Sequence, residues 1–411
     1  MKILLIGSGA REHAIAYKLS LSQKVEKIFV APGNGGTYVE NKCKNIDIKN
    51  HDELLDFAKN NSIDFTFVGP EQPLADGIVD LFESNGLKII GPDKFSSQLE
   101  SSKSFAKKFM NKYNVQTANY KEFSKKNNID EITNLINYPA VIKADGLAAG
   151  KGVFISENKE NAKKVLKDLF EKEILGKASE KIIIEDAIPD FECSVFTFFD
   201  GENAKTFAYS QDHKKLYEGE KGPNTGGMGS ITPHPLITEK QKENIINKII
   251  NPTIKGIKKE KMNYKGVIFF GVKFKKDEPY LLEYNVRFGD PETQSIMYIL
   301  ETDLVEIFES ILNKSLNKIE IKLENKISQC VVVAAKGYPK KYNKNIELNL
   351  DNFNSKIFHA GTKIEKNKLL SCGGRIFSIV EKAETLSKTR EKIYSQLKSL
   401  KNPELYYRKD I

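Results

Sequence analysis

Short apolar runs that end in glycine-containing turns recur through the N-terminal part of the chain. These runs lie at residues 2–6, 25–30, 65–68 and 87–90. Helical patterns at about 51–60 and 73–85 separate them, and such alternation predicts a parallel α/β sheet. Ligands of these sheets bind beyond the carboxyl ends of the strands, where Gly7, Asn34 and Glu71 all stand.

The first turn, Gly7-Ser8-Gly9, opens an amphipathic helix that contains Arg11 and Glu12. A strand, a glycine turn and a helix N-terminus together predict an anion-binding site. The dinucleotide fingerprint needs Gly at the sixth position of G-x-G-x-x-G, where this chain has Glu12. The turn therefore argues against an oxidoreductase that uses a nicotinamide cofactor, but it is compatible with phosphate binding.

Residues 281–294 carry the densest polar chemistry in the chain. Alternate side chains of a strand share a face, so Glu283, Asn285 and Arg287 are predicted to point the same way. The opposite, core-facing side is formed by Leu282, Tyr284, Val286 and Phe288. A neighbouring carboxylate and amide can share one Mg²⁺, which takes its other ligands from water and phosphate.

The turn after this strand, Gly289-Asp290-Pro291-Glu292, adds further carboxylates. By itself the strand also fits the solvated face of an antiparallel pair. With the turn, and with Arg287 suited to a planar carboxylate or phosphate, the stretch predicts a phosphate–metal site.

A second candidate phosphate site lies at residues 138–153, where a predicted strand delivers Lys143 and a loop of Gly and Ala carries Lys151. Small residues let backbone N–H groups approach phosphates, and such loops often act as lids. The loop is not a Walker loop, because Gly152 replaces the Ser or Thr that would hold Mg²⁺. The alternative is a flexible hairpin tip.

Further elements are predicted along the chain. A strand at 181–185 ends in acids that could frame a base and its ribose. Residues 211–229 lack apolar periodicity and predict a long substrate-closing loop, in which a lone His213 is more often solvated than a base. The remaining predictions are helices at 101–113, 238–261, 303–313 and 383–399, a hairpin of 266–274 with 279–288, and strands at 330–335 and 375–380.

The composition excludes several classes. The chain of 411 residues has a net charge of +9, but only five of its 64 basic residues are Arg and the lysines are scattered, which argues against a nucleic-acid binder. Its four cysteines have no paired spacing, so neither a disulfide framework nor a zinc site is predicted. No apolar run reaches membrane-span length and no signal-peptide layout is present, so we expect a cytoplasmic protein without membrane contact.

Taken in order, these motifs resemble the phosphoribosylamine–glycine ligases (glycinamide ribonucleotide synthetases) of the ATP-grasp superfamily. The resemblance covers essentially the whole chain. The residues that carry it are 7–14, 31–34, 68–71, 142–152, 210–214, 222–229 and 285–294.

The resemblance implies an α/β ATP-grasp ligase in four parts. These are an N-terminal parallel α/β (pre-ATP-grasp) domain at 1–100, an entry helix and lid subdomain at 101–187, a central ATP-grasp domain at 188–325 and a C-terminal α/β domain at 326–411. From the residues alone, 326–411 is interpreted as a packing and substrate-closing domain.

The resemblance also implies roles for named residues. ATP would contact Lys103, Lys143, Gly150, Lys151, Gly152, Glu185, Asp186, Ala187, Ile188 and, at the ribose, Glu192. Mg²⁺ or Mn²⁺ would be held by Glu283 and Asn285. The two substrates, phosphoribosylamine and glycine, would contact Gly9, Arg11, Glu12, Asn34, Glu71, Asp212, Asn224, Gly227, Met228, Arg287 and Pro291. The catalytic set would be Arg287, Lys143 and Asp212.

The implied reaction is ATP-dependent joining of glycine to 5-phosphoribosylamine through a glycyl phosphate, as in de novo purine biosynthesis. The alternative is another ATP-grasp ligase, such as a carboxylase of a purine intermediate or a dipeptide ligase. We expect a monomer with small-molecule substrates and no nucleic-acid partner.

Overall fold

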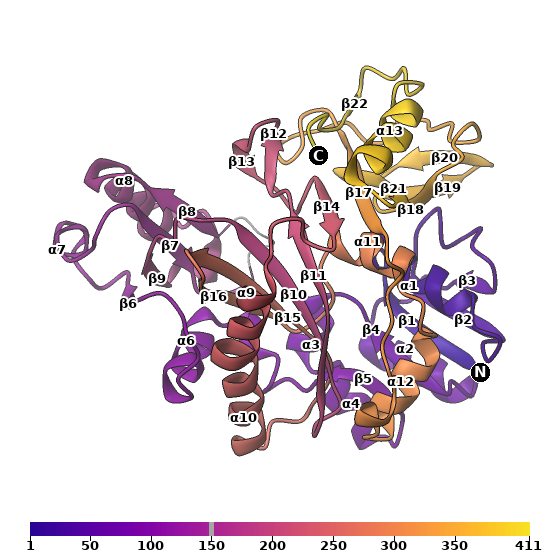
Figure 1. Cartoon of the computed structure of the whole chain (residues 1–411), viewed down its shortest axis with the longest axis horizontal. Helices are drawn as coiled ribbons and strands as arrows, with labels where there is room; N and C mark the ends of the chain where they lie inside the picture. The colour runs from indigo at the N-terminus through magenta and orange to yellow at the C-terminus, as the bar shows by residue number, and fades with distance from the viewer. Residues whose placement is uncertain (148–151) are drawn as a thin grey trace.

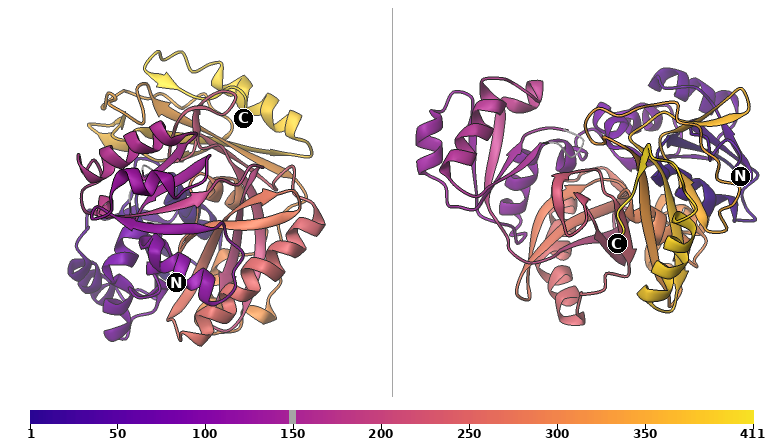
Figure 2. Two further views of the ribbon diagram at one scale, coloured as in Figure 1. Left: turned by 90° about the vertical axis from the view of Figure 1, so that its left-hand side faces the viewer. Right: turned by 90° about the horizontal axis from the view of Figure 1, so that it is seen from above.

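The structure, a computed structural model, describes residues 1–147 and 152–411. In Figure 1 a part that contains α7 (Ile129–Asn134) and α8 (Lys159–Phe170) projects to the left, and the C-terminal segment (yellow) lies above the N-terminal one (indigo). Figure 2 shows the same projection from above. A 14-stranded sheet runs through the body, and a four-stranded sheet belongs to the projecting part.

The N-terminal part confirms the predicted parallel sheet. Its strands are β1 (Lys2–Gly7), β2 (Lys27–Pro32), β3 (Cys43–Asn45), β4 (Phe65–Val68) and β5 (Ile89–Pro92). They lie in the order β5-β4-β1-β2-β3, with parallel pairing throughout. The helices are α1 (Ala10–Ser20), α2 (His51–Asn60), α3 (Glu71–Asp76), α4 (Ile78–Ser84) and α5 (Gln98–Ser101). The helical segment predicted for 73–85 is present as two helices, because Gly77 at φ +94° separates α3 from α4.

The projecting part follows α6 (Lys103–Lys112), which Ser102 caps by accepting a hydrogen bond from the Phe105 amide at its Oγ. Its strands are β6 (Tyr120–Ser124), β7 (Ala140–Ala144), β8 (Val153–Ser156) and β9 (Lys181–Asp186), with a short helix η1 (Gly176–Ser179) before β9. Ile182 and Ile184 of β9 pack in a hydrophobic cluster with α7 and α8. The alternation of a strand then turns Glu185 to the other face of the sheet.

The central part confirms the predicted hairpin, in which β15 (Tyr264–Lys275) pairs antiparallel with β16 (Glu278–Asn285). The other strands are β10 (Glu192–Phe199), β11 (Ala204–Asp212) and β14 (Gly229–Thr232). The helix predicted for 238–261 is present as α9 (Glu239–Ile245), one π turn η2 (Ile246–Ile250) and α10 (Asn251–Lys259). After the hairpin come α11 (Glu292–Ile299), α12 (Leu304–Leu312) and η3 (Leu316–Lys318).

A β-bulge changes the alternation predicted for β16. The register shifts between Gly271 and Val272, so that Glu283 lies opposite Gly271 and Leu281 lies opposite Val272. Leu281 is therefore fully buried, whereas Leu282, predicted for the core face, is only partly buried. The extra residue was not visible in the sequence because both positions are leucine.

The prediction of a long loop at 211–229 is wrong. After β11, the chain forms a hairpin of β12 (Lys215–Tyr217) with β13 (Lys221–Asn224) and then enters β14. Its strands are short and largely exposed, so they carry no apolar alternation for a sequence pattern to reveal.

The C-terminal part contains β17 (Ile327–Ala335), β18 (Lys356–His359), β19 (Thr362–Glu365), β20 (Lys368–Ser371), β21 (Arg375–Ala383), β22 (Leu405–Tyr406) and α13 (Leu386–Leu397). The predicted strands and final helix are confirmed. Pairing of β14 with β17, and of β5 with β15, links the three parts of the body into one sheet. The four-part division of the chain stays a prediction. Within the described ranges, the structure has no helix that is both long and apolar enough to span a membrane.

Candidate functional site

The polar face of β16 is assembled as predicted. Arg287 donates from Nη2 to Asn285 Oδ1 at 3.0 Å and to Glu100 Oε1 at 2.8 Å. Its Nε lies 3.4 Å from Glu71 Oε2. Glu100 also accepts from the Val286 amide at 2.7 Å, which anchors the strand end to α5. The guanidinium of Arg287 is thus held in one orientation by groups from three segments.

Glu283 is surrounded by positive charge. Lys103 Nζ is 3.9 Å from Glu283 Oε2. Burial raises the pKa of the Glu283 carboxyl, but the charges of Lys103, Lys214, Lys143 and Arg287 outweigh it and lower that pKa to about 2. Glu283 is therefore an ionised oxygen donor among cations, an arrangement suited to a polyanion and its metal ion.

Lys143 stands beside Glu283 on the neighbouring sheet. Its Nζ donates to Leu282 O at 3.1 Å and lies 2.9 Å from Glu185 Oε1. The structure therefore brings Lys143 and Glu185, both predicted to contact ATP, into direct contact. Gly152 is also described, and its carbonyl accepts from the Ala144 amide. Gly150 and Lys151 lie outside the described residues.

The segment predicted to read adenine follows β9. The Asp186 amide donates to Asn119 O and the Ala187 amide donates to Pro139 O, so these two N–H groups are already occupied. Ile188 O accepts from Lys273 Nζ at 2.8 Å. Glu192, predicted for the ribose, forms an ion pair with Lys214.

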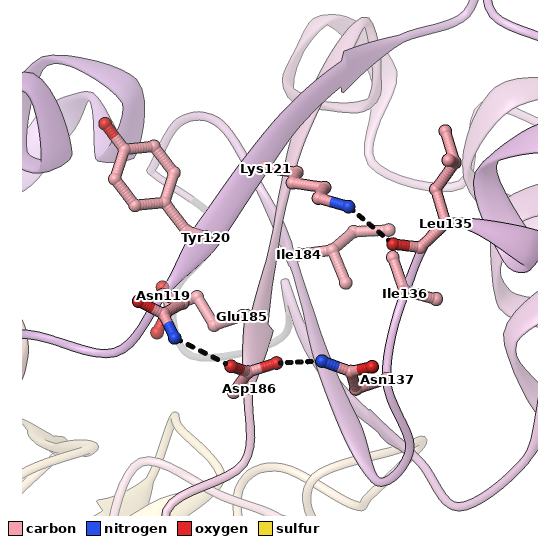
Figure 3. A pocket seen from close by; sticks show the side chains of 9 residues that line it. All are labelled: Asn119, Tyr120, Lys121, Leu135, Ile136, Asn137, Ile184, Glu185 and Asp186. Carbon is pink, nitrogen blue, oxygen red and sulfur yellow. Dashed lines mark hydrogen bonds between the residues drawn. The ribbon is translucent and has the colours of Figure 1, made fainter.

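Asp186 itself lines a cavity of about 250 Å³. Figure 3 shows its carboxylate between the side-chain amides of Asn119 and Asn137, at 3.2 and 3.4 Å. Successive side chains of a strand point to opposite faces of the sheet. Glu185 lies on the same face as Lys143, so the Asp186 side chain lies on the opposite face. The predicted contact of Asp186 with ATP stays a prediction.

Asp212 ends β11 and is the acidic centre of the predicted glycine site. Its Oδ1 is buried and has no hydrogen-bond partner within the described part of the chain. Burial and the nearby Glu292 carboxylate raise the pKa of Asp212 well above its usual value, against the charge of Lys214. Gly227 passes so close that a Cβ there would lie 2.9 Å from Asp212 Oδ1 and 2.3 Å from Pro291 Cδ.

The other predicted glycine-site residues lie around Asp212 but differ in exposure. Asn224 ends β13 and is partly buried. Met228 is fully buried in the C-terminal hydrophobic cluster, and its amide donates to His213 O at 2.8 Å. His213 is buried, not solvated as expected, with Nδ1 3.1 Å from Glu220 Oε1.

The N-terminal residues form a pocket of about 360 Å³ that is lined by Gly9, Arg11, Glu12 and, from the distant turn, Asp290. Arg11 Nε contacts Glu12 Oε1 at 2.6 Å, and its Nη1 donates to Phe288 O at 3.1 Å. Glu12 Oε2 accepts from the Gly9 amide at 2.6 Å, so this acid caps its own helix.

One acid near this pocket links it to the rest of the protein. Glu71 Oε2 lies 3.9 Å from Arg11 Nη1 and 3.4 Å from Arg287 Nε, so it bridges the pocket and the segment that follows β16. A Cβ at Gly69 would lie 2.1 Å from Glu12 Oε1, which requires glycine at that turn.

Asn34 does not line this pocket, but its side chain supports the lining turn at Ser8. Its Nδ2 donates to Ser8 O at 2.9 Å and to His359 O at 2.7 Å, and its Oδ1 accepts from the Gly36 and Thr37 amides. The side chain is buried and its hydrogen-bonding capacity is used within the protein. Its predicted contact with substrate stays a prediction.

The comparisons with known proteins bear on these residues together. Sequence profiles of the phosphoribosylglycinamide synthetase N domain, ATP-grasp (A) domain and C domain match residues 1–100, 101–293 and 328–411. The chain belongs to the phosphoribosylglycinamide synthetase family. This result confirms the resemblance inferred from the motifs.

Relatives of this synthetase agree over their full lengths. The phosphoribosylamine–glycine ligase of Clostridium acetobutylicum is 45% identical over 100% of this chain and 99% of the relative, and that of Fusobacterium nucleatum is 46% identical over 100% and 98%. The crystal structure of the Thermotoga maritima phosphoribosylamine–glycine ligase has a TM-score of 0.85 at 29% identity and covers 100% of both chains. A biotin carboxylase of Campylobacter jejuni in complex with β-γ-ATP has a TM-score of 0.70 at 18% identity, covering 99% of this chain and 91% of the other, which confirms the ATP-grasp fold alone.

The structure brings one further residue to this site that was not among the predicted site residues. Arg375, at the start of β21, donates from Nη1 to Asp290 O at 3.0 Å and from Nη2 to Asp290 Oδ2 at 2.9 Å. It also contacts the carbonyls of Gly226 and Gly227. The scarcity of arginine could have indicated it, since three of the five arginines contact this site.

Whether the site fits a divalent metal can be judged from its donors. In the described ranges no group of three or more His, Cys, Asp or Glu could hold a metal by itself. Glu283 and Asn285 offer two oxygens, and Asn285 Nδ2 is buried without a partner among the described residues. Mg²⁺ commonly takes one or two protein oxygens and completes its shell with phosphate and water, so these residues fit an ion that arrives with a nucleotide.

Proposed function

We propose that this protein joins glycine to 5-phosphoribosylamine with ATP, giving glycinamide ribonucleotide, ADP and phosphate. The observation that carries the proposal is the contact of Glu71 with both Arg11 and Arg287. Glu71 joins the N-terminal pocket to Arg287 just beyond β16. Arg375 joins Asp290 of that pocket to Gly227, which passes Asp212. The names of the relatives supply the substrates.

The nucleotide is proposed to lie between β9 and β16. Lys103 and Lys143 would contact its phosphates, the backbone at residues 186–188 its base, and Glu192 its ribose. A metal ion at Glu283 and Asn285 would neutralise charge on the phosphates and fix their position. Mg²⁺ and Mn²⁺ are both compatible with these two oxygen donors.

Glycine is proposed to bind with its ammonium group at Asp212 and its carboxylate toward Arg287. Asp212 Oδ1 is a buried acceptor without a partner among residues 1–147 and 152–411, and an ammonium supplies three donors. The ammonium would also stabilise the ionised form of Asp212 and lower its pKa. The N-terminal pocket would hold phosphoribosylamine near Arg11 and Asp290.

The proposed chemistry has two steps. A carboxylate oxygen of glycine attacks the γ-phosphorus, and the bond from that phosphorus to the ADP oxygen breaks, leaving glycyl phosphate. The amine of phosphoribosylamine then attacks the acyl carbon, loses a proton, and the carbon–oxygen bond to phosphate breaks. Positioning and charge neutralisation suffice for the first step, so no nucleophilic side chain is needed.

The direct test is ADP release with purified protein and chosen acceptor pairs. We expect release that requires glycine and phosphoribosylamine together, with glycinamide ribonucleotide identified by mass spectrometry. Release that instead requires bicarbonate, or alanine with a second amino acid, would replace the proposal with the carboxylase or dipeptide-ligase alternative.

A further inference from the structure

A buried lysine stands behind the proposed triphosphate site. Lys107 lies one turn after Lys103 in α6, and its side chain is 2% exposed. Lysine is almost never fully buried unless it is paired. Its surroundings therefore call for a specific role.

The Lys107 ammonium group is fixed by two oxygens. It donates to Thr117 Oγ1 at 2.6 Å, and the Thr117 hydroxyl in turn donates to Leu281 O at 2.6 Å. It also lies 3.3 Å from Glu185 Oε2. Glu185 is thus held from both sides, because its Oε1 is 2.9 Å from Lys143 Nζ.

Both lysines are anchored to the bulge of β16. Lys107 reaches Leu281 O through Thr117, and Lys143 donates directly to Leu282 O at 3.1 Å. The next residue is Glu283. The buried group of Lys107, Glu185 and Lys143 therefore connects α6 and the projecting sheet to the proposed metal strand.

The charges in this group do not cancel. Two ammonium groups share one carboxylate, so a net positive charge remains. Without Lys107, Glu185 and Lys143 would form a neutral buried pair, and the carboxylate would hold Lys143 back from an incoming phosphate. With Lys107 present, its ammonium group neutralises the Glu185 carboxylate, and the positive charge of Lys143 is available to the nucleotide.

We propose that Lys107 is a positioning residue that neutralises Glu185 and so leaves the charge of Lys143 to the triphosphate of ATP. This inference rests on one part of the proposed function, namely that ATP binds between β9 and β16. It concerns nucleotide affinity and not the identity of the acceptor.

The protonation of Lys107 should then appear in the pH dependence of nucleotide binding. The charged groups that face it are Glu185, Lys143 and Lys103, with the Tyr120 ring 5.6 Å away. Burial lowers the pKa of Lys107 to about 8, although Glu185 opposes this shift. Above that pH the free protein loses the proton, and affinity for a polyphosphate should fall.

The test is calorimetric binding of ADP with Mg²⁺ to the full chain, without glycine or phosphoribosylamine. Lys107→Met should raise the Kd for ADP about tenfold or more, because Glu185 would then weaken the charged contact between Lys143 and the phosphates. Lys107→Arg, which keeps the charge, should recover most of the affinity. The matched control is Lys108→Met, because Lys108 is also 3.3 Å from a glutamate, Glu122, but is 67% exposed; its Kd should match that of the wild type.

The pH series separates positioning from a purely structural role. The wild type and Lys108→Met should lose affinity above about pH 8, and this loss should be absent in Lys107→Met. A folded Lys107→Met variant with wild-type Kd and wild-type pH profile would overturn the inference. If that variant does not fold, a wild-type affinity that stays constant from about pH 7 to 9.5 would overturn it.

Failure of the proposed function gives a different result. If the wild-type protein binds ADP but makes no glycinamide ribonucleotide, the proposed function fails and the role of Lys107 in nucleotide binding is unaffected. If the wild type binds no ADP, both proposals fall together.

Discussion

The N-terminal pocket and the acidic centre differ in how their buried polar atoms are satisfied. At the pocket, Glu12 is bonded to Arg11 and to the Gly9 amide, and Asn34, which supports the lining residue Ser8, uses both ends of its side-chain amide. At the acidic centre, Asp212 Oδ1 is buried without a partner in the described chain, and so is Asn285 Nδ2 nearby.

This difference indicates two kinds of binding surface. Buried polar groups in native proteins are nearly always hydrogen-bonded, so an unpaired one needs an explanation. The pocket is complete before any ligand arrives, and its polar groups hold the walls in place. The acidic centre is incomplete: Asp212 Oδ1 lacks a donor, which the glycine ammonium would supply, and Asn285 Nδ2 lacks an acceptor, which a phosphate oxygen would supply.

The largest effect is expected for Glu283→Gln, which removes the charge of the proposed metal ligand. We expect turnover at saturating Mg²⁺ to fall by about 100-fold or more, as loss of a charge stabiliser typically does. The control is Glu278→Gln at the start of the same strand, whose carboxylate is 45% exposed and pairs with Lys248; it should retain wild-type turnover. Steady-state kinetics and thermal unfolding of both variants check this, and equal turnover in the two would refute the metal assignment.

Asp212→Asn tests whether the acidic centre binds glycine. Loss of a charged hydrogen bond to the ammonium should raise the KM for glycine about 10- to 150-fold. The KM for ATP should change little, because Asp212 is not proposed to touch the nucleotide. A rise in both constants to the same extent would assign Asp212 a general structural role instead.

Arg375→Lys tests whether the C-terminal part shapes the site. Lysine keeps the positive charge but lacks the planar guanidinium group, whose nitrogens bond to Asp290 and to the carbonyls of Gly226 and Gly227. We expect the KM for glycine to rise about tenfold, corresponding to one lost hydrogen bond to a charged group. Unchanged kinetics for both glycine and phosphoribosylamine would show that this contact serves stability alone.

Asn34→Ala should act mainly on stability. It removes a buried hub between the N-terminal turns and β18, so the free energy of unfolding should fall by about 1–3 kcal/mol. The variant should keep the KM for glycine, because Asn34 contacts neither Asp212 nor Arg287 among the hydrogen bonds of the described residues. Denaturant unfolding measures the first effect. A stable variant with a raised KM for phosphoribosylamine would instead support the predicted substrate contact.

The smallest expected effect is a pH dependence of stability. The folded protein raises the pKa of Asp212, so it holds that proton more tightly than the unfolded chain does. Stability from this group is present at low pH and is lost as the pH rises through the raised pKa. The Tm of the wild type, relative to that of Asp212→Asn, should therefore fall as the pH rises above the ordinary aspartate pKa of about 4. Parallel Tm curves for the two proteins would contradict the raised pKa.

The local features of this protein could be predicted from its amino-acid sequence. Apolar runs and glycine turns predicted the parallel sheet, and alternation placed Glu283, Asn285 and Arg287 on one face. The ordered motifs predicted the family and the ATP-grasp fold. These features follow from the backbone geometry of a few neighbouring residues, which a short stretch of sequence specifies.

Contacts between residues that are distant in the sequence could not be predicted and are seen in the folded chain. The tertiary structure brought Arg375 to Asp290 and Lys107 to Glu185, buried His213 beside a hairpin that no pattern predicted, and placed a bulge at Leu282. The physical reason is that such contacts depend on how separate elements pack. Each element's own sequence fixes its shape, whereas the charge that it finally faces is set by elements far away along the chain.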